Sequence, residues 1–296
     1  MNETILATAS VCREFFEDGR PVVEVEYKGD FSVAKTFDCG QCFRFDPVET
    51  TEYDAEYAGV AHGRYVSFAQ RGDRLYVKGA DREDFEKIWC SYLGLDVDYD
   101  AINADILSRS DSPALRAALE CGRGIRILKQ EPWEAVCSFI ISQNNNIPRI
   151  KRIISVLSER YGQPIGQGRY AFPTAEALFI AGEKSIFELK TGFRAKYITD
   201  ASARVSDGRL DLSDIGDTTE AAVKKLCEVK GIGPKVALCS LLFGFSRLDA
   251  FPIDVWIRRV MEKYFHEGFS PEELGPYAGI AQQYLFYYER YIVGKE

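Results

Sequence analysis

The stretch Val223–Phe243, VKKLCEVKGIGPKVALCSLLF, decides the expected fold of this chain. It predicts a helix that ends near Val229, a tight turn at Gly231-Ile232-Gly233, and a second helix that begins at Pro234. Glycine adopts positive φ without strain and leaves room for another backbone to approach. We therefore expect a helical hairpin (residues 223–243) whose turn amides, with the N-terminus of the second helix, can bind phosphate.

The segment after this hairpin adds an acidic residue at a defined distance. Asp254 lies in FPIDVW (251–256), nineteen positions beyond Lys235. Its position is suited to capping the helix that follows, and capping alone is one interpretation of it. A hairpin lysine followed by Pro-x-Asp resembles, however, the signature of the helix-hairpin-helix DNA glycosylases. A non-catalytic DNA-binding module that kept the hairpin is the alternative of a different class.

The charge of the chain is unevenly distributed. Its 296 residues are 46% hydrophobic and 28% charged, which excludes a disordered chain, and the net charge is −8. The first 110 residues contain 12 Lys+Arg and 22 Asp+Glu, whereas the other 186 contain 25 and 23. The hairpin part is thus slightly positive, so the overall acidity does not exclude a nucleic-acid partner. We expect only a moderate salt dependence of DNA binding.

The first part of the chain predicts mainly β-strands, and the second part predicts helices. Residues 23–27 alternate in polarity like a half-buried strand, and residues 64–69 and 74–78 predict a hairpin around a turn at 71–73. Asp81 caps a helix that Gly94 ends, and beyond residue 112 apolar stripes predict helices only. The expected class is α+β, with an N-terminal antiparallel β-sheet domain (1–112) and an all-α helix-hairpin-helix domain (113–296).

Six blocks, in one order, resemble the 8-oxoguanine DNA glycosylase/AP lyases of the helix-hairpin-helix (HhH-GPD) superfamily. They are FDCGQCFRF (37–45), QEPWEAVCSFIISQNNNIPRI (130–150), TGFRAKYI (191–198), GIGPKVALC (231–239), FPIDVW (251–256) and AGIAQQYLF (278–286). The resemblance implies a bifunctional enzyme of base excision repair. Its implied substrate is double-stranded DNA containing 8-oxoguanine, preferentially opposite cytosine. The enzyme would reach the damaged base by flipping it out of the duplex.

The resemblance also implies the catalytic residues. Lys235 matches the nucleophile that attacks the sugar carbon C1′ and forms a Schiff base, from which β-elimination proceeds. The amine must be neutral to attack, which desolvation and a place in the first turn of a helix both favour. Asp254 matches the carboxylate that stabilises positive charge on the sugar. Trp256 stands where eukaryotic members commonly have histidine.

Recognition of the lesion and of its partner base is implied in the same way. Gly40 matches the glycine whose carbonyl accepts the N7–H that guanine lacks. Gln282 and Phe286 match residues that read and stack on the flipped base, with Cys239 on its other face. We expect both to face away from a buried stripe of Tyr277, Ile280, Ala281, Tyr284 and Tyr288.

The resemblance also implies which residues contact the DNA around the flipped base. Asn144 matches the residue that fills the vacated stack, Phe193 the wedge between bases, and Arg149 and Arg194 the readers of the orphaned cytosine. Gly231 and Gly233 match the hairpin glycines that contact DNA. The alternative makes the asparagines a helix cap and the arginines solvated surface.

The sequence favours no cofactor. Cys39 and Cys42 form a CxxC without a second ligand pair or a βαβ context, which disfavours metal binding and redox chemistry. No cysteine follows Cys239, so the four clustered cysteines of an iron–sulfur cluster are absent. A structural cation could bind hairpin carbonyls, with no side-chain ligand; the candidates are those of Cys227, Val229 and Ile232.

The sequence also gives expectations about the localisation and the oligomeric state of the protein. The sequence has no signal peptide and no apolar run long enough to span a membrane, so we expect a cytoplasmic protein, associated with the nucleoid if prokaryotic. One hairpin and one pocket suffice for recognition, so we expect a monomer. A helix-hairpin-helix glycosylase for another damaged base is the alternative within this fold.

Overall fold

The computed structural model describes residues 9–295, which belong to two compact units. Unit 1 comprises the chain up to Gly59, Tyr65–Lys129 and Ile253 onwards; unit 2 comprises Val60–Arg64 and Gln130–Pro252. The units therefore interleave along the sequence. The boundary at residues 112/113, which divides the chain by type of secondary structure, stays a prediction.

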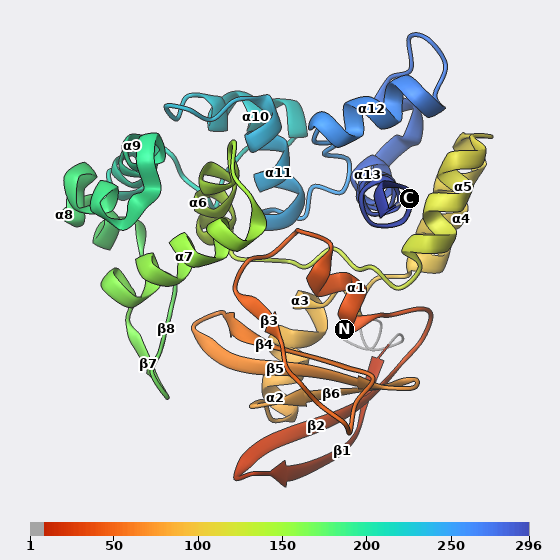
Figure 1. Cartoon of the computed structure of the whole chain (residues 1–296), viewed down its shortest axis with the longest axis horizontal. Coiled ribbons are helices and arrows are strands. Elements are labelled where there is room, and N and C mark those ends of the chain that lie inside the picture. The colour runs from red at the N-terminus through yellow and green to blue at the C-terminus, as the bar shows by residue number, and fades with distance from the viewer. Residues whose placement is uncertain (1–8, 296) are drawn as a thin grey trace. The chain divides into compact units, whose positions relative to one another are not determined.

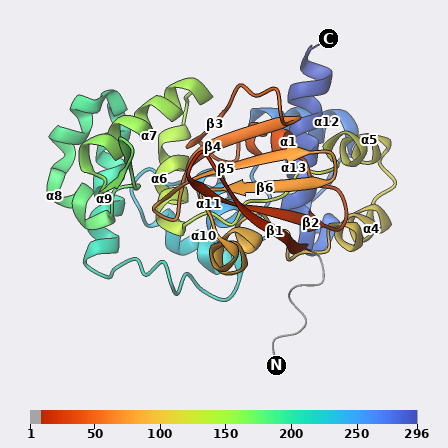
Figure 2. The same cartoon turned by 90° about the horizontal axis from the view of Figure 1, so that it is seen from below.

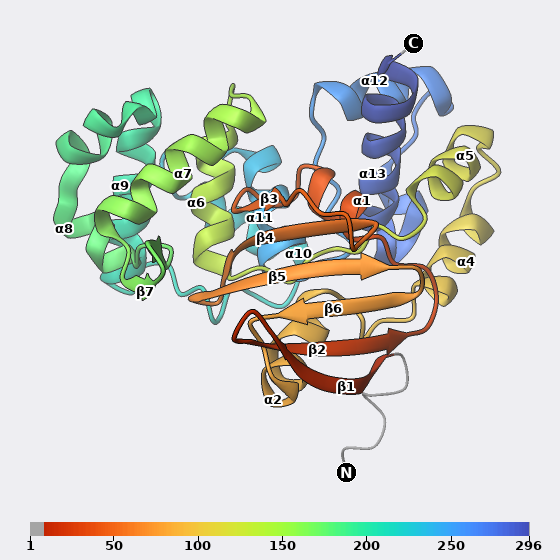
Figure 3. The same ribbon diagram turned by 60° about the horizontal axis from the view of Figure 1, so that its bottom comes forward.

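Unit 1 is built on an antiparallel six-stranded sheet in the order β1-β2-β6-β5-β4-β3 (Figure 3). The strands are β1 Ala9–Glu17, β2 Arg20–Tyr27, β3 Phe45–Pro47, β4 Ala55–Ala61, β5 Arg64–Arg71 and β6 Arg74–Lys78. The predicted strands are confirmed, as is the turn between β5 and β6, where Gly72 has φ +58°. Asp18 and Gly19 also have positive φ, which suits the tight turn between β1 and β2.

The helices of unit 1 come from both ends of the chain (Figure 1). They are α1 Val33–Asp38, α2 Arg82–Asp84, the π-helix η1 Phe85–Trp89, α3 Cys90–Tyr92, α4 Tyr99–Arg109, α5 Pro113–Gly122, α12 Val255–Tyr264, η4 Pro271–Tyr277, α13 Ala278–Tyr287, η5 Tyr288–Ile292 and η6 Val293–Lys295. The helix predicted after Asp81 is confirmed, with a π-helical stretch in its middle. Asp81 accepts a hydrogen bond from the N–H of Asp84 (2.8 Å), and Gly94 follows with φ +63°.

An aromatic cluster joins α1 and α3 to the sheet. Its members are Phe37, Phe45, Tyr57, Phe68, Trp89 and Tyr92, all buried. The ring of Phe68, on β5, lies at the centre of this cluster, 5.3 Å from the ring of Phe37 and 5.6 Å from that of Trp89. Phe37 lies three residues before Gly40, so this packing fixes the end of α1 from which the Gly40 segment emerges.

Unit 2 is mainly helical, and α7, α8 and α9 pack side by side in it (Figure 2). Its elements are α6 Pro132–Ser142, α7 Ile147–Tyr161, β7 Pro164–Gly166, β8 Arg169–Tyr170, α8 Ala175–Ile186, the π-helix η2 Phe187–Thr191, the 3-10 helix η3 Gly192–Arg194, α9 Ala195–Ser206, α10 Thr219–Cys227 and α11 Pro234–Gly244. Helices predominate beyond residue 112, as predicted, but the short antiparallel strands β7 and β8 correct the expectation that this part contains helices only. Across residues 9–295, no helix combines the length and apolar character needed to cross a bilayer.

The aromatic cluster gives a direct test of the core of unit 1. Phe68→Ala leaves a cavity under several rings, so we expect it to lower the free energy of unfolding by about 3–5 kcal/mol. The control Phe16→Ala removes a ring that is 76% exposed and should cost less than about 0.5 kcal/mol. Urea denaturation of both variants measures the difference, and equal losses would contradict the packing described.

Candidate active site

The hairpin of unit 2 is a six-residue turn between α10 and α11. The N–H of Val229 donates to the carbonyl of Leu226 (3.1 Å), and that of Ile232 donates to the carbonyl of Val229 (3.0 Å). Gly231 has φ +81°, and a Cβ atom there would lie 2.4 Å from ring carbons of Tyr197. Both its backbone conformation and the adjacent ring therefore require glycine at position 231.

The second hairpin glycine plays a different part. Gly233 is the N-cap of α11 and has φ −99°, so it does not use the positive φ that glycine permits. A Cβ atom at this position would meet nothing within 4 Å. The fold therefore tolerates a side chain at position 233, and an argument for glycine there has to come from a bound partner.

Lys235 lies in the first turn of α11, above an apolar wall. Its Nζ atom is 6.0 Å from the ring centroid of Phe139, on α6, and the side chain is half-buried. Phe139 stacks on Phe243 with ring centroids 5.3 Å apart. Cys239, one turn beyond Lys235, is buried. The arrangement gives the lysine an apolar and partly buried surrounding.

The carbonyls predicted to hold a cation lie around the same turn. That of Val229 accepts the hydrogen bond from Ile232, which uses one of its two lone pairs. Among the described residues, no group of histidine, cysteine and acidic side chains is arranged to hold a metal ion. A cation held by backbone oxygens of Cys227, Val229 and Ile232 stays a prediction.

Asp254, in unit 1, caps α12 as the sequence predicts. Its Oδ1 atom accepts hydrogen bonds from the N–H groups of Trp256 and Ile257, each at 2.9 Å. Both bonds end on the same oxygen, so Oδ2 is not used by the cap. The carboxylate can therefore cap the helix and still present an oxygen to a developing positive charge.

The Gly40 segment of unit 1 follows α1 and is tightly held. Gly40 has φ +81°, and the next residue, Gln41, is fully buried. The Nε2 atom of Gln41 donates to the carbonyls of Thr36 and Arg126, both at 2.8 Å, and its Oε1 atom accepts from the N–H of Leu128 (2.8 Å). One side-chain amide thus ties this segment both to α1 and to the extended stretch that precedes α6.

The two cysteines beside Gly40 belong to the interior. Cys39 and Cys42 are both buried free thiols. Burial raises the pKa of Cys39 to about 12, so its reactive thiolate is scarce at neutral pH. The structure thus gives no support to redox chemistry at this CxxC.

Helix α13 differs from the expected one-sided stripe. Residues 278–285 are all buried, Gln282 among them, whereas Tyr277 and Tyr288 are only half-buried. Gln282 is therefore buried although helical spacing places it off the predicted stripe, because α13 is surrounded by protein on nearly every side. Phe286 is half-buried, with the guanidinium carbon of Arg290 5.4 Å from its ring centroid.

The three asparagines in the loop between α6 and α7 have three different roles. Asn144 is exposed and has φ +46°, in the left-handed region. Asn145 donates through Nδ2 to the carbonyl of Ile141 (3.1 Å). Asn146 caps α7 by accepting from the N–H of Arg149 (3.0 Å). The cap interpretation is therefore right for Asn146, while Asn144 projects from a strained backbone position.

Arg194 is buried and holds this loop in place. Its Nε atom donates to the carbonyl of Gln143 (3.0 Å), and its Nη2 atom donates to the carbonyls of Gln143 and Asn144, the latter at 2.9 Å. The Nη1 atom donates to the carbonyl of Thr191 (3.2 Å). Burial, and then the neighbouring Arg149, lower the pKa of Arg194. The alternative that made this arginine solvated surface is wrong.

Phe193 and Arg149 lie beside the same loop. Phe193 is 45% exposed, and its ring centroid is 4.5 Å from the guanidinium carbon of Arg194. Arg149 is exposed on α7 and donates to the carbonyl of Lys190 (3.4 Å). The structure thus brings Asn144, Arg149, Phe193 and Arg194 together in unit 2.

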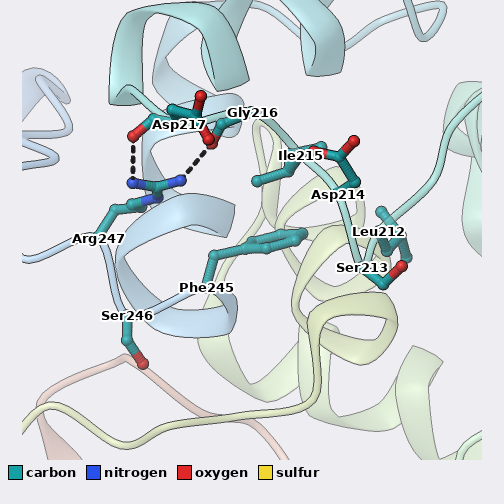
Figure 4. A pocket seen from close by; sticks show the side chains of 9 residues that line it. All are labelled: Leu212, Ser213, Asp214, Ile215, Gly216, Asp217, Phe245, Ser246 and Arg247. Carbon is teal, nitrogen blue, oxygen red and sulfur yellow. Dashed lines mark hydrogen bonds between the residues drawn. The ribbon is translucent and has the colours of Figure 1, made fainter.

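A separate cavity of about 420 Å³ opens in unit 2 and includes none of the predicted site residues in its lining. Figure 4 shows Arg247 donating hydrogen bonds to the carbonyls of Gly216 and Asp217, which fastens the loop before α10 to the end of α11. The cavity is lined by Leu212, Ser213, Asp214, Ile215, Gly216, Asp217, Phe245, Ser246 and Arg247.

Two side chains that support the site have no local sequence pattern that predicts their role. Gln41 lies between the cysteines of the CxxC, and Gln283 follows Gln282. The Nε2 atom of Gln283 donates to the carbonyl of Cys39 (2.9 Å). The contacts of both side chains depend on tertiary packing. The one signal in the sequence is that each of these glutamines stands in a short block rich in apolar residues.

Two family models match consecutive parts of the chain. The N-terminal domain of 8-oxoguanine DNA glycosylase matches residues 25–136, and the HhH-GPD superfamily of base excision DNA repair proteins matches residues 137–273. Together they cover both the Gly40 segment and the hairpin.

Known proteins agree with these matches. The apo structure of the Clostridium acetobutylicum 8-oxoguanine glycosylase/lyase is 36% identical, with TM-score 0.85, over 94% of this chain and 99% of that one. A structure of MBOgg1 with a low-affinity DNA ligand is 39% identical, with TM-score 0.83, over 94% and 98%. The N-glycosylase/DNA lyase of Saccharomyces cerevisiae is 34% identical over 58% of this chain; the match spans about half (49%) of the yeast protein.

One conclusion follows from the matched family models, the sheet of unit 1 and the helical hairpin of unit 2. The chain belongs to the 8-oxoguanine DNA glycosylase family of the HhH-GPD superfamily, whose members are N-glycosylase/DNA lyases of base excision repair.

Proposed function

We propose that this enzyme excises 8-oxoguanine opposite cytosine in double-stranded DNA and then cleaves the strand at the abasic site. The observation that carries the proposal is the half-buried Lys235 in the first turn of α11, with Phe139 and Cys239 beside it. Support also comes from the Clostridium acetobutylicum enzyme, solved with double-stranded DNA that contains cytosine opposite 8-oxoguanine. That chain is 35% identical to this one, with TM-score 0.82.

Lys235 supplies the nucleophile in this proposal. Its neutral amine bonds to C1′ while the glycosidic bond breaks, and the bonding pair leaves with the base, which gains a proton. The C1′–O4′ bond then breaks, O4′ keeps the bonding pair and takes a proton from water, and the opened sugar carries a protonated imine between C1′ and Nζ. A proton acceptor then removes a 2′-proton, and β-elimination expels the 3′-phosphate oxygen. Hydrolysis of the imine by water releases the lysine. Asp254 stabilises the positive charge that develops on the sugar.

Recognition of the base rests on the Gly40 carbonyl. 8-Oxoguanine carries a hydrogen on N7, whereas guanine presents a lone pair there and would face the carbonyl with a second acceptor. Gln282 reads the Watson–Crick edge of the flipped base, and Phe286 and Cys239 stack on its two faces. These assignments use the family resemblance, and the closely held Gly40 segment supports the first of them.

Recognition of the orphaned cytosine falls to the loop cluster of unit 2. Asn144, Phe193 and Arg149 are exposed there and can reach DNA without rearrangement. Arg194 now donates to the carbonyls of Gln143 and Asn144. We propose that it exchanges some of these bonds for the O2 and N3 atoms of cytosine, which accept from a guanidinium fork.

The nucleophile is tested by reductive trapping. In the presence of borohydride we expect the wild type to form a covalent complex with a duplex that carries 8-oxoguanine opposite cytosine. Lys235→Ala should abolish this complex and slow base release at least about 10³-fold. The control Lys224→Ala removes an exposed lysine of α10 that pairs with Glu220, and it should trap normally. A trapped complex in Lys235→Ala would contradict the assignment.

The two functions of Asp254 can be separated by substitution. Asparagine caps a helix as well as aspartate does, so Asp254→Asn should keep the melting temperature while the excision rate falls about 10²-fold or more. Asp98→Asn is the matched control, because Asp98 caps α4 through a bond from the N–H of Ala101 (2.9 Å). An Asp254→Asn enzyme with the wild-type single-turnover rate would show that the residue is only a cap.

The cytosine readers are tested with the four possible bases opposite the lesion. We expect the wild type to be fastest opposite cytosine and Arg149→Ala to lose about tenfold of that preference. Arg152→Ala, an exposed arginine of the same helix, should change the four single-turnover rates by a common factor. Equal wild-type rates on all four duplexes would be inconsistent with the proposed roles of Arg149 and Arg194.

A further inference from the structure

The peptide group before Gly40 is held by a residue from the far end of the chain. Gln283, on α13, is 3% exposed, and its Nε2 atom donates to the carbonyl of Cys39 at 2.9 Å. Cys39 is itself fully buried. Because the carbonyl of Cys39 and the N–H of Gly40 belong to one peptide group, this bond fixes the orientation of that peptide.

The residue after Gly40 is fixed from another direction. The amide of Gln41 spans α1 and the stretch 126–128. Arg126 in turn donates to the carbonyl of Asp30 (2.8 Å) and to that of Val97 (3.1 Å). The backbone therefore has a fixed point on each side of Gly40, provided by Gln283 on one side and Gln41 on the other.

Gly40, between these two fixed points, is the residue at which the backbone can rotate most easily. Gly40 has φ +81°, and the absence of a side chain makes rotation of its neighbouring peptide groups easy. Rotation of a peptide group exchanges the places of its C=O and N–H. An N–H in the place of the Gly40 carbonyl would suit the N7 lone pair of guanine and oppose the N7–H of 8-oxoguanine.

We propose that Gln283 is a positioning residue for base selection, which keeps the Gly40 carbonyl in the orientation that accepts a hydrogen from N7. The inference rests on the proposed function, since it presumes that Gly40 reads the base. Gln283 need not touch the DNA, because it acts through the peptide group between Cys39 and Gly40. Loss of its donor leaves the catalytic lysine and aspartate intact.

Two substitutions of similar size separate this role from simple packing. Gln283→Met keeps the volume and removes the donor, and Gln283→Glu replaces the donor with an acceptor that repels the carbonyl of Cys39. Ser202→Ala is the control for loss of one buried hydrogen bond, because its hydroxyl donates to the carbonyl of Ile198 (2.7 Å) in α9. Each variant is assayed by single-turnover excision of 8-oxoguanine and by strand cleavage at a preformed abasic site, which holds no base to select.

We expect excision to fall about fivefold to tenfold in Gln283→Met, and further in Gln283→Glu, while cleavage at the abasic site stays at the wild-type rate. In a Lys235→Gln background, Gln283→Met should reduce the ratio of binding to 8-oxoguanine over guanine duplexes by a similar factor. Ser202→Ala should leave the excision rate, the rate of cleavage at the abasic site and the binding ratio unchanged.

Two results would overturn the inference. Equal loss of both activities in the Gln283 variants would mean that the residue is only structural, and unchanged excision with an unchanged binding ratio would mean that the Gly40 carbonyl needs no such support. Failure of the proposed function is distinguishable, because the wild type itself would then leave 8-oxoguanine in place.

Discussion

The position of the hairpin lysine depends on the contact between Gly231 and the ring of Tyr197. A side chain at Gly231 would overlap this ring, so the turn can pass over α9 only at a glycine. The N–H of Lys230 also donates to Asp200 (2.8 Å), which fastens the turn to the same helix. Helix α11 begins directly after this turn, and so its first residues, Lys235 among them, are placed by a contact that contains no catalytic group.

Both units use long polar side chains to hold backbone at the proposed recognition sites. Arg194 binds the carbonyls around Asn144 in unit 2, and Gln41 and Gln283 bind the backbone around Gly40 in unit 1. Such buried groups are stable only when their hydrogen bonds are made, so they hold the backbone in one conformation. In the proposed complex with DNA, Arg194 exchanges hydrogen-bond partners, whereas the two glutamines keep theirs.

Local patterns allowed much of this to be predicted. Strands β2, β5 and β6, the Asp81 and Asp254 caps and the hairpin depend on neighbours in the sequence, and the structure has them where they are expected. The burial of Arg194 and the contact of Gln283 with Cys39, 244 residues away, depend on tertiary packing and leave no local pattern. The burial of Gln282 leaves no local pattern either, because a one-sided stripe does not reveal how many sides of a helix are covered.

The proposed removal of 8-oxoguanine paired with cytosine can be measured in a single turnover. Excess wild-type protein is incubated with such a duplex, and the free 8-oxoguanine is quantified chromatographically. We expect one released base per duplex, with strand cleavage at the same position. Binding of the duplex without any released 8-oxoguanine would contradict the proposal and would favour a DNA-binding module that kept only the hairpin.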